Sequence, residues 1–517
     1  EDDGAITAAQ RKEAEAAPIA LTAYNRPRRD TGFAFVDQLY REARTLPNVG
    51  SLTGSSFVVR STIEPELQRA AEAALQDGLA KYEQSMGRTS FRGPEANLSA
   101  AIKKIQADAK ADQSKPAWQL ALMNAQPPLY DVQWTPAVVM DKTPIKGGFD
   151  SIRVGLRDGR TFPLSTFGSN TRRLIGMYDL VYVQVIEGKG KEGTRVELRS
   201  RPTVQGATVV LENKTGRILA MVGGFSYPLS QLNRATQSRR QPGSSFKPMS
   251  YLAALAAGLQ PNTLADDGPI TLPPIGNTRY AQAKDYWSPK NYDGGGGGTM
   301  TLRRALENSR NLVTAHLLDG GIAPTPAESL DKVCQLAMEA QIYQSCERYY
   351  PFILGAQPVR VIDMAAFYAA IANEGMRPTP HAIEQIEKDG EVVYKSPNRL
   401  VSIASADRPA FFQLRTMLQG VVARGTAARI SHLSQFVAGK TGTSDDENDT
   451  WFAGFSNDVT IVVWVGYDNA GRVRRTLGHG ATGGKVALPI WENIMQAAWR
   501  VHGPKVPLPG PSPEASK

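Results

Sequence analysis

Two kinds of hydrophobic pattern occupy separate blocks of this chain, and they limit its fold more than any other feature. Between Ile63 and Gln84 apolar residues recur at helical spacing, whereas between Trp134 and Arg199 short apolar runs predict strands. The chain has 517 residues, and a single hydrophobic core stops growing near about 250–300 residues. We therefore expect two or three domains, at least one of them built mainly of strands.

Five strand-sized segments lie in the block between Trp134 and Arg199. Five short strands in about 65 residues favour a small barrel of the oligonucleotide/oligosaccharide-binding (OB) class, with a plain β-sandwich fragment as the alternative. Alternation along Val181–Val185 predicts that one face is buried and the other free. The expected strands are Ala137–Met140, Ile152–Leu156, Thr161–Leu164, Leu180–Val185 and Arg195–Leu198.

The region from Ala207 onward mixes strands with helices. A hairpin turn is expected at Asn213–Gly216, and a mainly helical stretch runs from Ser244 to about Ala372. Helices that cover a mostly antiparallel sheet make an α+β domain. The later strands are expected at Ala382–Ile386, Val392–Tyr394, Phe436–Ala438, Trp451–Phe455 and Thr460–Val465, before a helix near Ile490–Trp499.

The positive charge of the chain does not indicate a nucleic-acid-binding protein. The net charge is +9, but the Lys and Arg residues are scattered, and no zinc-finger or RNA-binding signature accompanies them. No HExxH, His/Cys cluster, Walker motif or dinucleotide glycine pattern occurs. We therefore expect no nucleic acid, no metal and no other cofactor.

Neither a membrane span nor a signal peptide is evident in the sequence. The best apolar run, Ile461–Val465, is strand-sized, whereas a span needs about 18–20 apolar residues. The sequence starts inside a helix-like stretch, Ala8–Ala17, and ends in a Pro-rich tail. We expect this chain to be a piece whose membrane anchor is missing.

Three short motifs follow one another in an order that suggests serine chemistry. They are Ser244-Ser245-Phe246-Lys247, Ser309-Arg310-Asn311 and Lys440-Thr441-Gly442-Thr443. Motifs of these three kinds, with Asp in place of Arg310, occur together in penicillin-binding proteins and β-lactamases.

The spacing of the first motif explains how a serine can become a nucleophile. The break at Gln241-Pro242-Gly243 lets Ser244 open a helix, so that Lys247 lies on the same face and can reach the Ser244 hydroxyl. A lysine acts as a base only when it is neutral, which requires burial or a neighbouring cation such as Lys440. Free N–H groups at the helix start can supply half of an oxyanion hole.

Single copies of these motifs carry little weight. A second Lys-Thr-Gly, at 214–216, lies in the hairpin turn, and a second Ser-x-Asn, at 396–398, lies in a Pro-containing loop. The five histidines form no triad; we expect His316 to be structural, while His479 can line a site. Cys334 and Cys346 form either a disulfide or two free thiols.

Longer segments around the motifs resemble class A penicillin-binding proteins, the bifunctional enzymes of peptidoglycan synthesis. The resemblance covers roughly residues 207–495. It rests on Arg234-Ala235, Arg240–Pro248, Trp287–Asp293, Thr301–Arg303, Ile353–Gly355, Gly425-Thr426, Lys440–Thr443 with Trp451-Phe452, and Thr482–Gly484.

The resemblance implies a β-lactamase/transpeptidase-like domain that cross-links stem peptides and is blocked by β-lactams. Ser244 is then the acylated nucleophile and Lys247 its base, while Ser309 and Asn311 move protons and hold the substrate amide. Lys440, Thr441, Gly442 and Thr443 bind the substrate carboxylate. The N–H groups of Ser244 and Thr443 form the oxyanion hole. The donor ends in D-Ala-D-Ala, and the acceptor is an amine on a neighbouring stem.

The same resemblance suggests the rest of the organisation. The first 20 residues resemble the end of a glycosyltransferase domain, and the barrel matches an insertion to which an activating envelope lipoprotein binds in one subgroup. We expect a site on the periplasmic face of a bacterial inner membrane and, in that oxidising compartment, a Cys334–Cys346 disulfide. The expected divisions are residues 1–47, 48–133, 134–205, 206–500 and 501–517.

Three other functions share the motif triple. A β-lactamase hydrolyses the drug, a D,D-carboxypeptidase hydrolyses the stem peptide, and a sensor binds β-lactams without turnover. A deacylating glutamate would favour the first, and Glu339 and Glu374 are the candidates between the second and third motifs.

Overall fold

The computed structural model describes residues 6–17, 29–47, 49–88, 91–108, 112–144, 151–188, 193–276, 281–469, 474–502 and 504–516. It separates into two units, Glu1–Asp30 and Thr31–Lys517. The first contains helix α1 (Ala8–Ala16), which Thr7 and Gln10 close with a reciprocal capping box, so the predicted helix is confirmed. The stretches 18–28, 145–150 and 189–192, the last two of which fall between predicted strands, lie outside the described residues.

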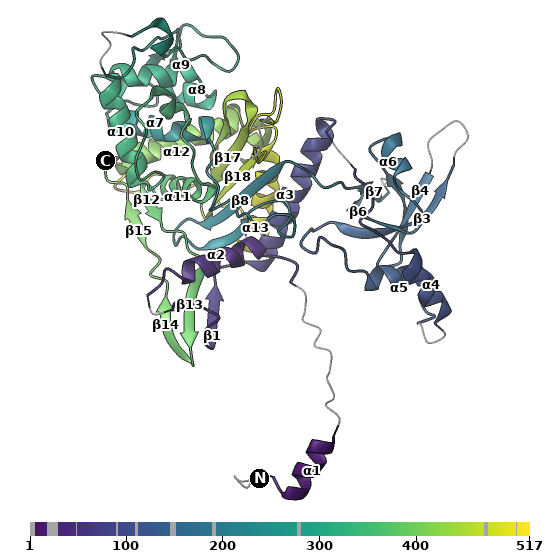
Figure 1. Cartoon of the computed structure of the whole chain (residues 1–517). Coiled ribbons are helices and arrows are strands. Elements are labelled where there is room, and N and C mark those ends of the chain that lie inside the picture. The colour runs from purple at the N-terminus through teal and green to yellow at the C-terminus, as the bar shows by residue number, and fades with distance from the viewer. Residues whose placement is uncertain are drawn as a thin grey trace. The chain divides into compact units, whose positions relative to one another are not determined.

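A five-stranded antiparallel sheet forms the centre of the second unit, in the order β16-β17-β18-β8-β9 (Figure 1). Its strands are β8 (Gln205–Glu212), β9 (Ile218–Val222), β16 (Ala438–Thr443), β17 (Asp449–Phe455) and β18 (Val459–Gly466). Helices α3 (Pro65–Ser85) and α13 (Ala487–His502) pack on one face, and α11 (Val361–Ala372) packs on the other. Both faces are covered, which explains the continuous apolar runs of β17 and β18.

Indole side chains connect the sheet to helix α13 and two of its strands to each other. The Trp491 ring of α13 meets the Phe452 ring of β17 at 5.0 Å, and its N–H donates to the Ile461 carbonyl at 2.9 Å. The N–H of buried Trp464 donates to an Asp449 carboxylate oxygen at 2.8 Å. These rings therefore bury a large apolar area without leaving a polar atom unpaired.

One strand of this sheet lies later in the sequence than we predicted. The prediction ended at Ala438, but β16 begins there and contains the whole third motif. Glycine is depleted in strands, so a segment that contains Gly439 and Gly442 is not recognised as a strand from residue propensities. Gly442 is required because a side chain there would lie 2.4 Å from the Pro242 carbonyl oxygen.

The helical stretch predicted from Ser244 is confirmed, and a further helix follows it. Ser244 itself lies in a single 3-10 turn, Gly243–Phe246, that leads into α7. The helices are α7 (Lys247–Ala256), α8 (Leu302–Glu307), α9 (Asn311–His316), α10 (Pro326–Glu339), α11 and α12 (Arg408–Arg424).

Smaller sheets surround this core. The strands predicted near 382–386 and 392–394 exist as β13 (Ile383–Lys388) and β14 (Glu391–Lys395), but they pair with an unpredicted β1 (Phe57–Ser61) in a separate sheet. Two two-stranded sheets join β10 (Leu264–Asp266) to β11 (Thr299–Thr301) and β12 (Met376–Pro378) to β15 (Leu400–Ser402). Helix α2 (Phe33–Ala43) packs on β9 and β13.

The five strands predicted between Trp134 and Arg199 are confirmed and close into a ring. The strands are β3 (Thr135–Thr143), β4 (Ser151–Leu156), β5 (Thr161–Ser165), β6 (Asp179–Ile186) and β7 (Arg195–Leu198). Their neighbours run β6-β3-β4-β5-β7, and β7 also pairs with β6. A short β2 (Ala96–Asn97) adds to β6, and α6 (Ser169–Arg173) connects β5 to β6.

The prediction of one free face on β6 is wrong for its first half. Helices α4 (Ser99–Ala107) and α5 (Ala117–Asn124) pack on the outside of the ring, against Val138 and Leu180. Tyr182 joins the large core through Trp134. Alternation fails here because both sides of the strand are covered.

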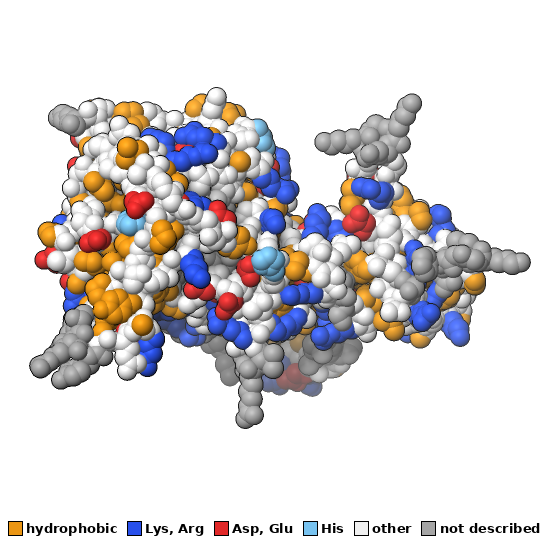
Figure 2. Space-filling model, turned by 90° about the horizontal axis from the view of Figure 1, so that it is seen from above, with side chains coloured by type: hydrophobic (Ala, Val, Ile, Leu, Met, Phe, Trp, Pro, Cys, Tyr) orange, Lys and Arg blue, Asp and Glu red, His pale blue; other side chains and the backbone are white. Residues whose placement is uncertain are grey.

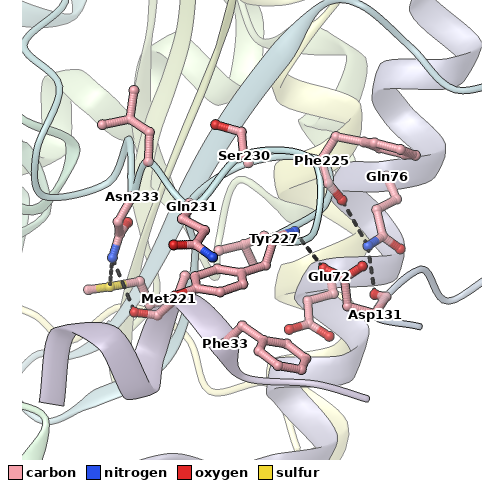
Figure 3. A pocket seen from close by; sticks show the side chains of 15 residues that line it. Phe33, Glu72, Gln76, Asp131, Met221, Phe225, Tyr227, Ser230, Gln231 and Asn233 are labelled. Carbon is pink, nitrogen blue, oxygen red and sulfur yellow. Dashed lines mark hydrogen bonds between the residues drawn. The ribbon is translucent and has the colours of Figure 1, made fainter. Parts of the chain in front are cut away.

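A buried polar cluster joins α3 to the segments on either side of it. The Gln76 amide donates to the carbonyls of Asp131 and Phe225, and Asp131 accepts from the Tyr227 N–H at 2.7 Å (Figure 3). Glu72 accepts from Thr31 and Gly32, and burial raises the pKa of Glu72 and of Asp131. The cavity beside them is about 30 Å³, the room of one water molecule, so we interpret it as structural.

Figure 2 shows Lys and Arg side chains dispersed over the viewed face among acidic and apolar ones, without a continuous basic stripe. The Pro-rich tail lies on the helical region, where Arg415 donates to the Pro509 carbonyl at 2.7 Å. Within the described residues, no helix has both the length and the apolarity that a membrane crossing requires.

Cys334 of α10 and Cys346 are joined by a disulfide, with their Cα atoms 5.8 Å apart. A cross-link over 12 residues removes about 3 kcal/mol of conformational freedom from the unfolded chain in the chain-entropy model. We expect the paired variant Cys334→Ser/Cys346→Ser to unfold at lower urea concentration by a corresponding amount. Reductant should lower the midpoint of the parent protein equally and leave the variant unchanged; two titratable thiols in unfolded, unreduced parent protein would contradict the disulfide.

Candidate active site

Ser244 lies in a turn that is pressed against the edge of the central sheet. Gly243 has φ +51°, and a side chain there would lie 2.2 Å from the Thr443 carbonyl oxygen. Ser245 points inward, where its hydroxyl donates to the Pro242 carbonyl and its own carbonyl accepts from the Tyr368 hydroxyl. The turn therefore brings the half-buried Ser244 beside the third motif.

The side chains of the three motifs meet at Ser309. The ammonium of Lys247 donates to the Ser309 carbonyl and to the Asn311 side-chain oxygen, each at 2.6 Å, and lies 3.3 Å from the Ser309 hydroxyl. Lys440 donates to the same hydroxyl at 2.9 Å. Ser309 has φ +58°, an uncommon conformation for a serine, and such strained residues cluster at functional sites.

Within the described residues, the Lys247 amine donates to Ser309 and Asn311 and not to the Ser244 hydroxyl that the spacing allows it to reach. Ser244 and Lys247 belong to one continuous helical segment, three positions apart, as expected from the sequence. Catalytic hydrogen bonds are often long in unliganded sites and tighten when substrate binds.

Both lysines are held in an environment that favours their neutral form. Burial lowers the pKa of Lys247 well below its usual range, and the charges of Lys440 and Arg310 lower it further, against the opposing effect of Asp267. Burial alone lowers the pKa of Lys440 to about 7. Burial is therefore the main cause of the lowered pKa of Lys247, and the charge of Lys440 is a secondary cause.

Arg310, the departure from the usual second motif, is paired with two carboxylates at the wall of the cleft. Its guanidinium donates to Asp267 at 2.9 Å and to Asp293 at 2.7 Å. Asp267 accepts from the Asn291 amide at 3.0 Å, and the Asn291 oxygen accepts from the backbone N–H of Asn311 at 2.7 Å. Arg310 thus anchors a chain of contacts that fixes the position of Asn311.

The edge position of β16 gives Thr443 the free N–H that the oxyanion hole requires. Ser444 donates to the Asp449 carbonyl, so Ser444 and Asp449 form a hydrogen-bonded pair. The next pair, Thr443 with Thr450, is then not hydrogen-bonded, and the Thr443 N–H points away from β17. Since β16 is the edge strand, this N–H faces the turn that carries Ser244.

An open cleft of about 850 Å³ lies over these residues. Ser244, Asn311, Thr441 and Thr443 line it, and the fully exposed His479 stands at its border. A second hollow, which shares Ser244, Asn311 and Thr443 with the cleft, has an apolar wall of Trp287, Pro351 and Leu354. Gly442, at the centre of the third motif, allows the backbone of β16 to pack closely against Pro242 and Ser245.

The sequence alone assigned no role to several residues that the structure places in the site. The Thr426 hydroxyl lies 2.7 Å from that of Thr441, and the Gly483 N–H donates to the Thr443 hydroxyl at 3.2 Å. Both belong to segments whose resemblance we noted, which was the available signal. Asp267 belongs to no such segment and had none.

The rival candidates of the sequence lie elsewhere. Glu339 binds Ser405, and Glu374 accepts from the Ser512 N–H; neither lines the cleft. The second Lys-Thr-Gly, at 214–216, lies in the β8–β9 turn, and His316 lies 3.0 Å from the Gly268 carbonyl oxygen. Within the described residues no cluster of His, Cys, Asp or Glu is suited to hold a metal.

This geometry suits acyl transfer through a serine ester, because it supplies a nucleophile, a buried amine and an outward N–H. A family model described as the penicillin binding protein transpeptidase domain matches residues 206–333 and 357–496, more than half of the chain. The chain belongs to this family, whose fold is a mixed α+β transpeptidase fold and whose members are peptidoglycan transpeptidases inhibited by penicillins.

Individual relatives extend the similarity to nearly the whole chain. Penicillin-binding protein 1A of Rickettsia conorii is 30% identical over 543 residues, which cover 99% of this chain and 62% of that protein. Penicillin-binding protein 1A of Aquifex aeolicus is also 30% identical, over 97% of this chain and 61% of its own. The chain therefore spans less than two thirds of the length of these relatives.

Two solved structures share the fold. The crystal structure of penicillin-binding protein 1A from Haemophilus influenzae has a TM-score of 0.72 at 24% identity, covering 99% of this chain and 76% of that one. PonA1 from Mycobacterium tuberculosis, solved in complex with penicillin V, has a TM-score of 0.58 at 19% identity, covering 95% of this chain and 98% of that one.

The two lysines predict a bell-shaped pH dependence of acylation by penicillin. The rate should rise with pH as Lys247 loses its proton, since only the neutral amine is a base. It should fall as pH rises through about 7, where Lys440 loses the charge that binds the drug carboxylate. Stopped-flow acylation across this range measures both limbs. In Lys440→Arg the falling limb should disappear and the rising limb should remain; a falling limb that stays in place would exclude Lys440 as its cause.

Proposed function

We propose that this chain is a D,D-transpeptidase that cross-links peptidoglycan stem peptides through an acyl-enzyme on Ser244. The observation that carries the proposal is the meeting of Lys247, Lys440 and Asn311 at Ser309, beside the turn that presents Ser244. In this arrangement the Ser309 hydroxyl contacts both buried amines and can pass protons between them and a substrate bound at Ser244.

The first half of the reaction forms the ester. Neutral Lys247 takes the Ser244 proton, and the Ser244 oxygen attacks the carbonyl carbon of the penultimate D-Ala. The N–H groups of Ser244 and Thr443 hold the oxyanion, while Lys440, Thr441 and Thr443 hold the terminal carboxylate. The terminal D-Ala leaves as an amine, after a proton passes from Lys247 through Ser309.

The second half reverses these roles with a different amine. The acceptor amine attacks the ester carbonyl and loses a proton to Lys247, and Ser244 leaves with its proton restored. A new peptide bond then joins the two stems. A β-lactam enters the first half in the same way, but its ring-opened amine stays attached and blocks the second.

Treatment with penicillin tests the assignment of Ser244. We expect the intact mass of the chain to rise by one drug molecule and peptide mapping to place the adduct on Ser244, because Ser245, its neighbour in the same helix-start turn, points inward. Ser244→Ala should abolish the shift, whereas the matched control Ser245→Ala removes the inward-facing neighbour and should keep it if folded. An adduct on Ser245 or Ser309 would refute the assignment.

Product analysis separates the alternatives. A transpeptidase releases D-Ala and makes a cross-link, a carboxypeptidase releases D-Ala alone, and a sensor releases none. Rapid turnover of bound penicillin would indicate a β-lactamase.

We propose that the remaining divisions follow the sequence, with residues 1–47 as the end of a glycosyltransferase domain and its linker, 48–133 as a helical connection, 134–205 as the barrel, 206–500 as the transpeptidase and 501–517 as the tail. A location on the periplasmic face of the inner membrane agrees with the Cys334–Cys346 disulfide, since such bonds persist in oxidising compartments.

We propose that the barrel is of the OB class and serves as a docking module, with an envelope lipoprotein as the partner. The closed five-strand ring and the helix between β5 and β6 support the class. Ser244, Lys247, Ser309 and Lys440 all lie outside the ring, which supports a role apart from the chemistry.

Deletion of residues 96–200 tests the separation of the barrel from the active site. The side chains of Glu95 and Arg201 form an ion pair, so the chain enters and leaves the barrel at neighbouring points that a short Gly-Ser linker can join. Because the deletion removes Trp134 from the large core, we expect a lower Tm. Penicillin acylation of Ser244 should stay within about twofold of the parent rate, far less than the loss of a catalytic group. Loss of acylation in a product that still melts cooperatively would show that the barrel shapes the active site.

A further inference from the structure

A second groove continues from the catalytic cleft, away from Ser244. It has a volume of about 620 Å³ and runs between α3 and the segment 479–493 at the start of α13. His479 borders both hollows, and the adjoining Thr482 and Gly484 line the cleft. The two hollows therefore adjoin at His479, next to the segment 482–484 that packs on the third motif.

Two cations in this groove have no acidic partner within the part of the chain that the structure describes. Lys485 and Arg429 are both exposed, and neither takes part in an ion pair, whereas the neighbouring Lys81 is paired with Asp77 at 2.6 Å. The Lys485 ammonium lies beside Gly480, 3.7 Å from where a side chain would begin there. The carboxylates of Asp77 and Glu492 also line the groove, but Lys81, Arg429 and Lys485 outnumber them, and this net positive charge favours a ligand that carries carboxylates.

The chemistry of transfer decides which substrate approaches from this side. The leaving D-Ala is held by its carboxylate at Lys440, Thr441 and Thr443, so its amine departs toward the third motif. The acceptor amine must attack from the position that the leaving amine has vacated, because aminolysis retraces the path of acylation. The rest of the acceptor stem then extends from the third motif toward His479.

We propose that the groove binds the acceptor stem peptide, with its terminal carboxylate placed between Lys485 and Arg429. This inference rests on the proposed transpeptidase function and assigns the second substrate of the same site. The donor stem is bound elsewhere in the cleft, so the groove affects aminolysis of the ester and leaves its formation alone. Water remains the competing nucleophile and needs no groove.

The partition of the acyl-enzyme between amine and water tests the assignment. The full chain is given one stem peptide ending in D-Ala-D-Ala as donor and a second stem peptide with a free side-chain amine as acceptor. In Lys485→Ala/Arg429→Ala we expect the ratio of cross-linked to hydrolysed product to fall about three- to tenfold, through a higher KM for the acceptor, as expected for two solvent-screened charge contacts. Lys395→Ala, which removes an exposed lysine from the separate β1-β13-β14 sheet, is the matched control and should leave the ratio unchanged.

An uncharged acceptor supplies the decisive comparison. When the terminal carboxylate of the acceptor is amidated, the parent enzyme should lose the same factor, and the double variant should lose nothing further. If acylation by penicillin is normal and the double variant partitions like the parent, the groove does not bind the acceptor, while the transpeptidase proposal stands. If the parent chain makes no ester at Ser244, the proposed function fails first.

Discussion

The burial of Lys247 is the constraint on which the rest of the site depends. A lysine in water is charged at neutral pH and cannot take a proton from serine, so the fold must remove this side chain from solvent. It does so at the first residue of α7, and the donors of the amine are then satisfied by Ser309 and Asn311. Since those acceptors come from a different element, the second motif must pack against the first. The close packing of β16 on the Ser244 turn completes the same enclosure and buries Lys440 as well.

Contacts outside the cluster around Lys247 hold the second motif in place. Arg310 holds Asp267, Asp267 holds Asn291, and Asn291 caps the start of α9 at Asn311. On the opposite side, the buried Glu307 carboxylate accepts two hydrogen bonds from Arg424, next to Thr426 and its partner Thr441. Two ion pairs therefore brace the second motif against the loops that flank it. An unpaired Asp267 or Glu307 would be costly at this depth, so each pair is maintained as a unit.

The sequence allowed the α+β class, the five barrel strands and the three motifs to be predicted, because each depends on local pattern. It did not allow β16 to be placed, since glycines needed for close packing resemble a loop when read alone. The covering of β6 by α4 and α5 was also missed. Alternation of apolar and polar residues predicts a strand with one buried face, whereas the first half of β6 is covered on both faces. Asp267 escaped notice for a similar reason: its partner Arg310 is 43 positions away. The assigned roles of Ser244, Lys247, Ser309, Asn311, Lys440 and Thr443 remain predictions that their geometry supports.

The tight seam between the Ser244 turn and β16 has a consequence for drug resistance. At Gly243 and Gly442 any larger residue would push its side chain into backbone atoms little more than 2 Å away. A mutation there therefore disrupts the active site itself and does not selectively reduce drug binding. Substitutions that discriminate between drug and substrate are thus confined to the rim of the cleft. Tyr292, Asp446 and His479 stand on that rim, where they can change without disturbing the seam. Selection by β-lactams should therefore accumulate changes in these bordering loops and leave the serine turn itself untouched.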